Sequence, residues 1–75
     1  MERDELKKAV QQKVSKMLAE KRAEKGLSLY KIEKMTGIHH AAIWRVERGD
    51  ISPRIDTLQR LCEVLELEIT LPLPI

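Results

Sequence analysis

The stretch GLSLYKIEKMTGIHHAAIWRVERGD, residues 26–50, decides the fold of this chain. Each of its three glycines follows a run of residues with helical spacing, and glycine readily takes the left-handed backbone conformation that ends a helix. The pattern therefore predicts one helix that ends before Gly26, a second over 28–35 and a third over 39–48. Ser28 suits the start of the second helix, because its hydroxyl oxygen can accept a hydrogen bond from a backbone N–H of the first turn.

Apolar residues recur at spacings of three and four on both sides of this stretch. They predict an amphipathic helix over 4–25 and a fourth helix over 55–65. The first helix would be about 33 Å long, so we expect its N-terminal half to project beyond so small a domain. The apolar residues of the two stripes are Leu6, Val10, Val14, Met17 and Leu18, and then Ile55, Leu58, Leu61, Cys62 and Leu65.

Residues 67–73 follow a different pattern, in which apolar side chains alternate with others as they do in a β-strand. One strand has no partner within this chain, so we expect two chains to pair these strands in an antiparallel ribbon across a homodimer. Pro72 lacks an N–H group and has the opposite parity to the apolar residues, which leaves the other edge for pairing. The apolar face of the strand consists of Leu67, Ile69, Leu71 and Leu73.

Size and composition limit what the chain can be. It has 75 residues, of which 43% are hydrophobic and 35% charged, with one Trp, one Tyr and no Phe. These values predict a single domain over 1–75 with an aliphatic helical core, and they argue against disorder and against a deep enzyme pocket. No apolar run has the length of a membrane helix, and the N-terminus lacks the pattern of a signal peptide. We therefore expect a cytoplasmic, nucleoid-associated protein with no membrane partner.

The charge is unevenly distributed along the chain. Residues 1–25 carry eight Lys/Arg against five Asp/Glu, residues 26–54 carry five against three, and residues 55–75 carry one against four. A basic front and an acidic end fit a protein that meets a polyanion with one surface, although mixed charge on helices is also typical of a solvated face.

Side chains for catalysis or metal binding are scarce. His39 and His40 are adjacent and would diverge around a helix, and Cys62 lies far along the chain, where a buried and inert thiol is expected. No carboxylate and His have the i, i+4 spacing of a metal-ligand pair, and no glycine-rich phosphate loop is present. The sequence therefore predicts no enzyme, no catalytic residue, no metal site and no cofactor.

Two short helices joined by a tight turn with a glycine form a helix-turn-helix. Over residues 18–67 the sequence resembles the Cro and phage-repressor family, also called the Xre family. The resemblance implies a mostly α fold of the lambda-repressor type, with four helices or slightly more and one C-terminal strand that pairs across a dimer. The matching positions are Arg22, Gly26-Leu27-Ser28, Ile32, Thr36-Gly37-Ile38, Ile43, Arg45, Val46-Glu47-Arg48-Gly49, Pro53, Thr57-Leu58, Leu61 and Leu65.

The resemblance also implies roles for individual residues in binding double-stranded DNA. It makes 39–48 the recognition helix, and it implies a structural ion pair between Arg22 and Glu47. Arg45 is the best candidate for reading a base, because its guanidinium can bond O6 and N7 of one guanine, and a phosphate contact is its alternative. The implied base-contact residues are His40, Ala41, Trp44 and Arg45, and the implied phosphate-contact residues are Ser28, His39, Arg48 and Arg54.

Three positions depart from the family pattern. Leu29 stands where a Gln often contacts a phosphate, which puts one DNA contact in doubt. Arg54 stands where a Ser or Thr commonly caps the fourth helix. Either Arg54 serves the polyanion at some cost in helix capping, or Ser52 or the loop supplies the cap instead. Glu33 replaces a customary Ala, and we expect its carboxylate to reach solvent.

The implied function is a sequence-specific DNA-binding transcriptional regulator, a dimeric repressor of a palindromic operator. Residues 65–71 are similar to the strand of HipB-like antitoxin repressors, which leaves open an antitoxin that binds a toxin and represses its own operon. A protein-interaction module without DNA binding is a third reading, favoured by Leu29 and by the few polar side chains on the recognition helix.

Overall fold

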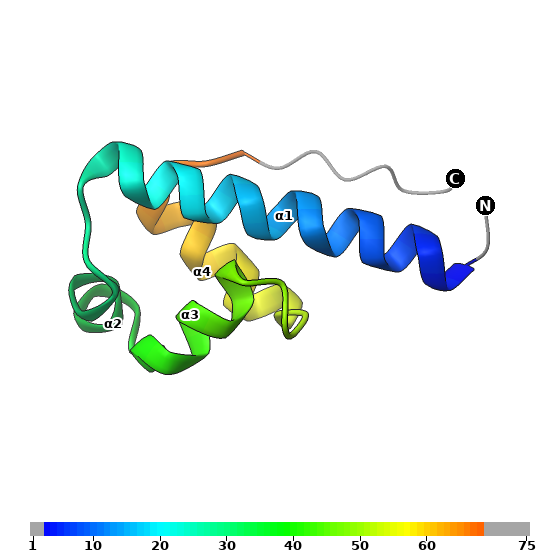
Figure 1. The fold of residues 1–75 in the computed structure, drawn as a ribbon. Helices are drawn as coiled ribbons and strands as arrows, with labels where there is room; N and C mark the ends of the chain where they lie inside the picture. Colours follow the sequence, from blue (N-terminus) through cyan, green and yellow to red (C-terminus); the bar gives the residue numbers. More distant parts are fainter. Residues whose placement is uncertain (1–2, 69–75) are drawn as a thin grey trace.

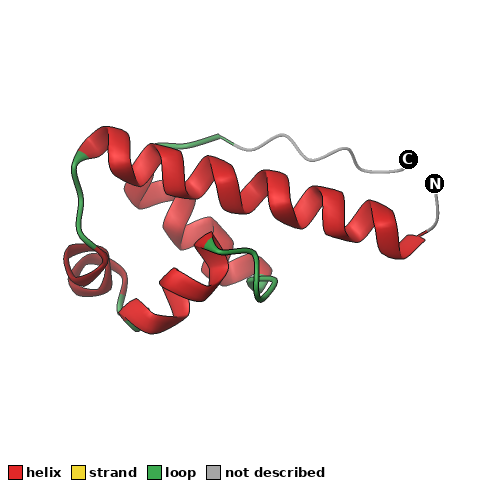
Figure 2. Cartoon of the chain, in the orientation of Figure 1, coloured by secondary structure: helices red, strands yellow, loops and turns green. Residues whose placement is uncertain are grey.

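The computed structural model describes residues 3–68, which form four helices joined by short loops (Figures 1 and 2). The helices are α1 (Arg3–Lys25), α2 (Leu29–Thr36), α3 (His40–Glu47) and α4 (Ile55–Leu65). The expected mostly helical architecture is confirmed. The expected bounds of the third helix include its two caps, because His39 and Arg48 flank the helix rather than belong to it.

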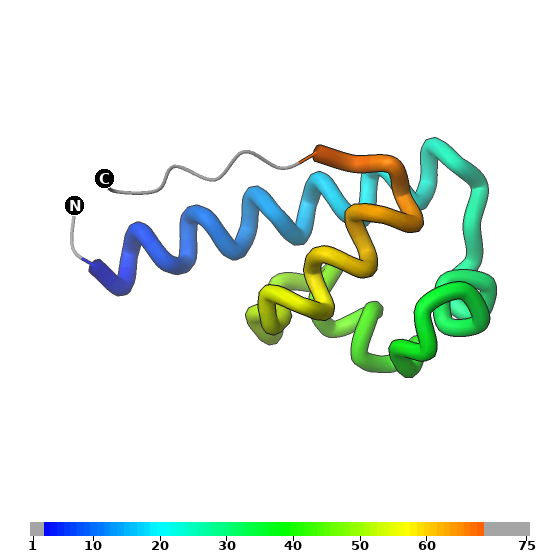
Figure 3. The backbone as a smooth tube through the Cα atoms, turned by 180° about the vertical axis from the view of Figure 1, so that it is seen from behind, coloured from blue at the N-terminus to red at the C-terminus, as the bar shows by residue number. Residues whose placement is uncertain are grey.

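The long helix α1 lies across α3 and α4, and α2 packs against α3 and α4 on the other side (Figures 1 and 3). The N-terminal half of α1 projects beyond the other helices in both views. Leu6 in that half is 50% exposed and lines an open groove between α1 and the start of α4. No helix within residues 3–68 is long and apolar enough to cross a membrane.

The core takes one or two aliphatic side chains from each helix. The apolar stripes of the sequence converge here because the short loops bring α3 and α4 against α1, and α2 against α3 and α4. Leu27, Leu29 and Leu67 pack against the core from the helix ends. The buried residues are Val14, Leu18, Ile32, Ile43, Val46, Leu61 and Leu65.

An ion pair joins the end of α1 to the end of α3. The Arg22 Nε and Nη2 groups donate to Glu47 Oε2 and Oε1 at 2.7 and 2.9 Å. The Nη1 group of Arg22 donates to the carbonyl of Leu27 at 2.9 Å, in the loop before α2. The Glu47 side chain is only 5% exposed, and its hydrogen bonds raise the pKa of the Arg22 guanidinium above the ordinary value. One guanidinium thus connects α1, the first loop and α3.

Three helices end with the same hydrogen bond, in which an N–H reaches back five residues. The donors are Leu27, Asp50 and Leu67, and the distances to the carbonyls of Arg22, Arg45 and Cys62 are 3.1, 3.0 and 2.9 Å. This closure requires a left-handed residue just before the donor, which is glycine at two of the ends. At the end of α4 that residue is Glu66 at φ 54°, a conformation that costs free energy for a residue with a Cβ.

The start of α4 differs from what the sequence indicated. Arg54 occupies the N-cap position, and neither its side chain nor that of Ser52 makes a hydrogen bond to the first turn of the helix. The idea that Ser52 or the loop replaces the missing cap is therefore wrong. Asp56 in the first turn accepts a hydrogen bond from the N–H of Thr57 at 3.0 Å, which satisfies one of the free donors.

The predicted strand falls mostly outside the described residues. Leu67 and Glu68 are described and have no strand structure, while Ile69, Leu71 and Leu73 lie beyond them. Residues 66–68 run beside α1 toward its N-terminal half (Figures 1 and 3). No strand is present within residues 3–68.

Replacing Glu47 by Ala should lower the free energy of unfolding by about 3 kcal/mol or more, because it leaves the Arg22 guanidinium partly buried without its partner. An apolar double replacement, Arg22→Met with Glu47→Leu, should cost much less. The exposed pair of Lys16 and Glu20 gives the control, and Glu20→Ala should change the free energy by only about 0.5 kcal/mol. Urea unfolding followed by circular dichroism measures all three. A Glu47→Ala variant with the parent's urea midpoint would contradict the structural role of the pair.

Replacing Gly37 by Ala should destabilise the turn between α2 and α3 by about 1 to 2 kcal/mol. Gly37 has φ 79°, and a Cβ added there would meet no atom within 4 Å, so the cost comes from the backbone conformation alone. Gly37→Asn should cost less, because Asn tolerates the left-handed region better than Ala does. Equal urea midpoints for the Ala and Asn variants would show that the left-handed conformation is not what this position requires.

Candidate nucleic-acid interface

Local hydrogen bonds position α2 and α3 relative to the turn between them. Ser28 Oγ accepts from the N–H of Lys31 at 3.0 Å and so caps α2. Thr36 Oγ1 donates to the carbonyl of Ile32 at 2.8 Å and accepts from the N–H of Ile38 at 3.1 Å. The N–H of Gly37 donates to the carbonyl of Glu33 at 2.7 Å. The Thr36 hydroxyl and the N–H groups of Gly37 and Ile38 are therefore all hydrogen-bonded where α2 ends and the turn begins.

His39 caps the start of α3. Its Nδ1 accepts a hydrogen bond from the N–H of Ala41 at 3.1 Å, which requires an unprotonated Nδ1. The neutral ring therefore carries its proton on Nε2, and this N–H is available as a donor on an exposed side chain.

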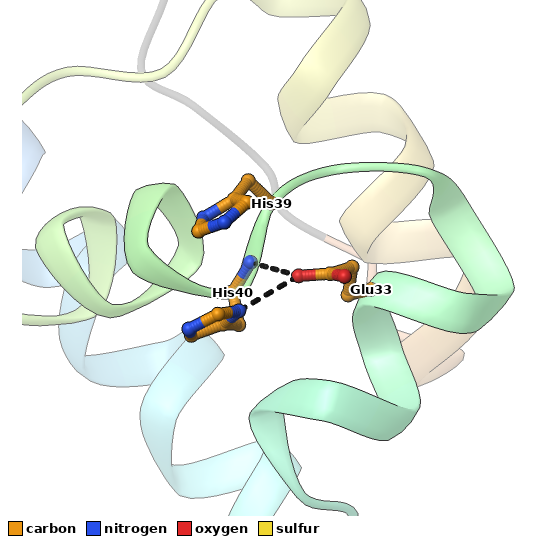
Figure 4. A group of neighbouring side chains, drawn as sticks. All are labelled: Glu33, His39 and His40. Carbon is orange, nitrogen blue, oxygen red and sulfur yellow. Dashed lines mark hydrogen bonds and ion pairs between the residues drawn. The ribbon is translucent and has the colours of Figure 1, made fainter.

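Glu33 holds the next residue, His40, from across the turn (Figure 4). One oxygen, Oε1, lies 2.7 Å from the backbone N of His40 and 2.8 Å from its Nδ1. An ionised carboxylate only accepts, so Nδ1 of the His40 ring donates the hydrogen bond. The hydrogen bonds from His40, first from its backbone N–H and then from its ring, hold the pKa of Glu33 below its ordinary value. The expectation that this carboxylate simply reaches solvent is corrected, because it caps α3 from α2.

Three aromatic rings lie side by side at this end of the helix-turn-helix. The Tyr30 and His40 centroids are 4.3 Å apart, and the His39 and His40 centroids are 4.2 Å apart with the rings tilted by 28°. The two histidines do not diverge around a helix as the sequence argument assumed. His39 lies outside α3 in extended backbone at ψ 137°, so the helical rotation between neighbours does not separate the two side chains.

The same arrangement brings together three groups that can bind a metal. The ligand atoms of Glu33, His39 and His40 lie within 4.8 Å of one another. Spacing within a single helix gives no sign of this cluster, because Glu33 and His40 are seven residues apart across a turn. One feature of the sequence could have indicated the cluster. Glu33 places a carboxylate where relatives usually have Ala, shortly before Gly37 and the two histidines.

The outer face of α3 carries the remaining candidates for base contacts. Trp44 is 47% exposed and the Arg48 guanidinium lies 5.8 Å from the centroid of its ring, while Ala41 is half-buried. Arg45 is exposed and has no ion-pair or hydrogen-bond partner for its side chain within residues 3–68. Its guanidinium is thus the free donor group of this face.

The basic candidates for phosphate contacts are also exposed. Arg48 lies 3.5 Å from Asp50, and Arg54 lies 3.7 Å from Asp56. Such exposed pairs contribute little in water and do not prevent a guanidinium from meeting another anion. Leu29, in contrast, packs against the core and offers nothing polar at the start of α2.

Comparison with known proteins agrees with this geometry. A family model described as helix-turn-helix matches residues 18–71. The chain is 38% identical over 55 residues to the HTH-type transcriptional regulator PuuR of Escherichia coli, which covers 73% of this chain and 30% of that protein. It is 39% identical over 61 residues to a putative HTH-type transcriptional regulatory protein of Aeropyrum pernix, covering 81% of this chain and 18% of that protein. No solved structure gives a significant match.

The chain thus spans less than a third of the length of these relatives, and the part it shares with them contains the helix-turn-helix. The family model covers all of α2, α3 and α4 and the end of α1 that carries Arg22. By this match the chain belongs to the helix-turn-helix family of the Cro and Xre type.

Proposed function

We propose that the chain is a DNA-binding module of a transcription regulator and that α3 enters the major groove. The observation that carries the proposal is the outer face of α3 within a family-matched helix-turn-helix, where an unpaired Arg45 and a half-exposed Trp44 stand beside each other. The guanidinium of Arg45 favours DNA binding over a module that has lost it, because it is exposed, has no partner within residues 3–68 and can donate to a base edge or a phosphate.

The hydrogen-bonding groups of α3 differ in what they can recognise. Arg45 supplies two parallel donors for O6 and N7 of a guanine. The hydrogen bond from His40 Nδ1 to Glu33 leaves Nε2 as an acceptor when the ring is neutral, and such an acceptor suits the amino group of cytosine or adenine. The module would therefore read a guanine with Arg45 and a neighbouring amino group with His40.

Other groups would position α3 without reading sequence. The Ser28 hydroxyl keeps its hydrogen free while its oxygen caps α2, and the His39 Nε2–H is free while Nδ1 caps α3. Both lie at helix N-termini, where backbone N–H groups and the helix dipole also favour a phosphate. Arg48 and Arg54 would add charge around the loop between α3 and α4.

We also propose that the module acts as a homodimer on a palindromic operator and represses transcription by occupying it. Two features support a dimer contact along α1. Leu67 packs against the core, and residues 66–68 run beside α1 toward its projecting half. That half and the start of α4 form an apolar groove of about 520 Å³, lined by Leu6, Val10, Pro53 and Leu58 among others. Strands from residues 67–73 of two chains, paired and laid against this surface, would cover it.

The base-reading role of Arg45 can be separated from general attraction to DNA. Arg45→Ala should weaken binding to a selected operator by about 1 to 3 kcal/mol and relax the preference at one base pair. Arg48→Ala and Arg54→Ala are the matched controls, and they should weaken all sequences alike and flatten the salt dependence. Fluorescence anisotropy with operator and random duplexes at several salt concentrations measures both effects. Equal losses on the two duplexes for Arg45→Ala would contradict base reading.

The dimer can be tested by shortening the chain. Deletion of residues 68–75 should give a monomer that keeps its helical circular dichroism, because the core residues all precede Glu68. Operator affinity should fall, since two recognition helices about 34 Å apart would no longer bind together. Analytical ultracentrifugation reports the mass, and a shortened chain that still sediments as a dimer would rule out the strand as its main support.

A further inference from the structure

The cluster of Glu33, His39 and His40 has the composition of a transition-metal site. Two imidazoles and one carboxylate are the nitrogen and oxygen ligands that Zn²⁺ takes in proteins, and three protein ligands leave a fourth position for water. Magnesium and calcium prefer oxygen ligands alone. Both histidines of the chain are in this cluster.

The distances in the cluster are close to those that a metal needs. Ligand atoms about 2.0 to 2.1 Å from a tetrahedral zinc ion are about 3.4 Å from each other. His40 Nδ1 and Glu33 Oε1 are already 2.8 Å apart, and all three ligand atoms lie within 4.8 Å of one another. A shift of between one and two ångströms by an exposed side chain, that of His39, closes the remaining gap.

We propose that Glu33, His39 and His40 together bind one divalent ion of the zinc type across the turn between α2 and α3. The ion takes the place of the proton that His40 Nδ1 shares with Glu33 Oε1, and this proton leaves to solvent. His39 turns its ring out of the stack shown in Figure 4 and gives up its hydrogen bond to the N–H of Ala41. The ion binds to the free protein, and its binding does not depend on the proposed DNA contacts.

The affinity for a cation should depend mainly on the Glu33 carboxylate, because the site lies at the N-terminus of α3. The helix dipole places partial positive charge there, which opposes a cation. The negative charge of Glu33 offsets both this field and part of the charge of the ion. A neutral group of the same shape at position 33 should therefore lose most of the affinity, even though it preserves the fold.

Two conservative variants separate metal binding from folding. Glu33→Gln keeps an oxygen that accepts from the His40 backbone N–H, and His39→Asn introduces a side chain that is strongly preferred at helix N-caps. Both variants should therefore unfold at nearly the parent's urea concentration in the absence of metal. Glu20→Gln removes an exposed carboxylate on α1 and serves as the matched control.

The binding experiment uses the untagged full chain, because a polyhistidine tag would itself bind zinc. Isothermal titration with Zn²⁺ should give one ion per chain, and the NMR signals of both histidine rings should shift. Glu33→Gln and His39→Asn should each weaken binding more than about tenfold, while Glu20→Gln should leave it unchanged. Mg²⁺ should give no saturable binding. Co²⁺ should give the visible bands of a tetrahedral site without a thiolate band, since Cys62 is on α4.

Several outcomes would overturn the proposal. They are the absence of saturable Zn²⁺ binding, a stoichiometry of one ion to two chains, and a thiolate band from Cys62 with Co²⁺. Unchanged affinity in either Glu33→Gln or His39→Asn would equally exclude a site made of all three ligands.

Discussion

The bidentate pair of Arg22 and Glu47 is the constraint on which the arrangement of the helices depends. It is the point where the end of α1, the loop before α2 and the end of α3 meet, because the guanidinium of Arg22 on α1 donates both to a carbonyl of the loop and to a carboxylate of α3. A carboxylate that is 5% exposed is stable only with such a partner, so packings that separate the two residues leave a buried charge unpaired. The pair therefore acts more through specificity than through net stabilisation, because it disfavours alternative ways of packing four short helices.

The position of α3 follows from this constraint. Gln11 adds a second contact between α1 and the end of α3, since its Nε2 donates to the carbonyl of Gly49 at 2.8 Å. Ser15 is buried nearby, with no hydrogen-bond partner for its hydroxyl in the described part of the chain, and a Cβ on Gly49 would lie 3.7 Å from its oxygen. The C-terminal end of α3 is thus fixed to α1 by two long polar side chains of α1, those of Gln11 and Arg22. The outer face of α3 carries the exposed side chains of Trp44 and Arg45.

The N-terminal end of α3 is held differently, by polar groups near the surface. The side chains of Glu33 and His39 accept hydrogen bonds from backbone N–H groups of the first turn. Both side chains also carry atoms that can bind a metal ion. Such a turn can respond to an ion without disturbing the core, because the buried residues of α3 are Ile43 and Val46, further along the helix. The proposed DNA contacts and the proposed metal site share His39 and His40. These two rings are therefore the residues through which one could influence the other.

The helices and the turn could be predicted from local patterns of residues. Ser28 and Gly37 act through hydrogen bonds that span three or four residues, and the apolar stripes act through a period of 3.6, so both are visible in a short window. The positions of Arg22 and Glu47 also followed from the sequence, through the family pattern. Local reasoning was least accurate at helix ends, where a cap such as His39 looks like a helical residue.

Which distant groups meet could not be predicted from such patterns and became visible in the packing of the helices. Glu33 reaches His40 because α2 and α3 cross at a particular angle, which no spacing within one helix can express. The exposure of Leu6 and the missing side-chain cap of α4 likewise depend on what the rest of the fold brings near, or does not. A strand over 67–73 is a different case, since its hydrogen bonds would belong to two chains. The physical reason is the same throughout, because short-range patterns specify elements, whereas the contacts between elements depend on the packing of the whole chain.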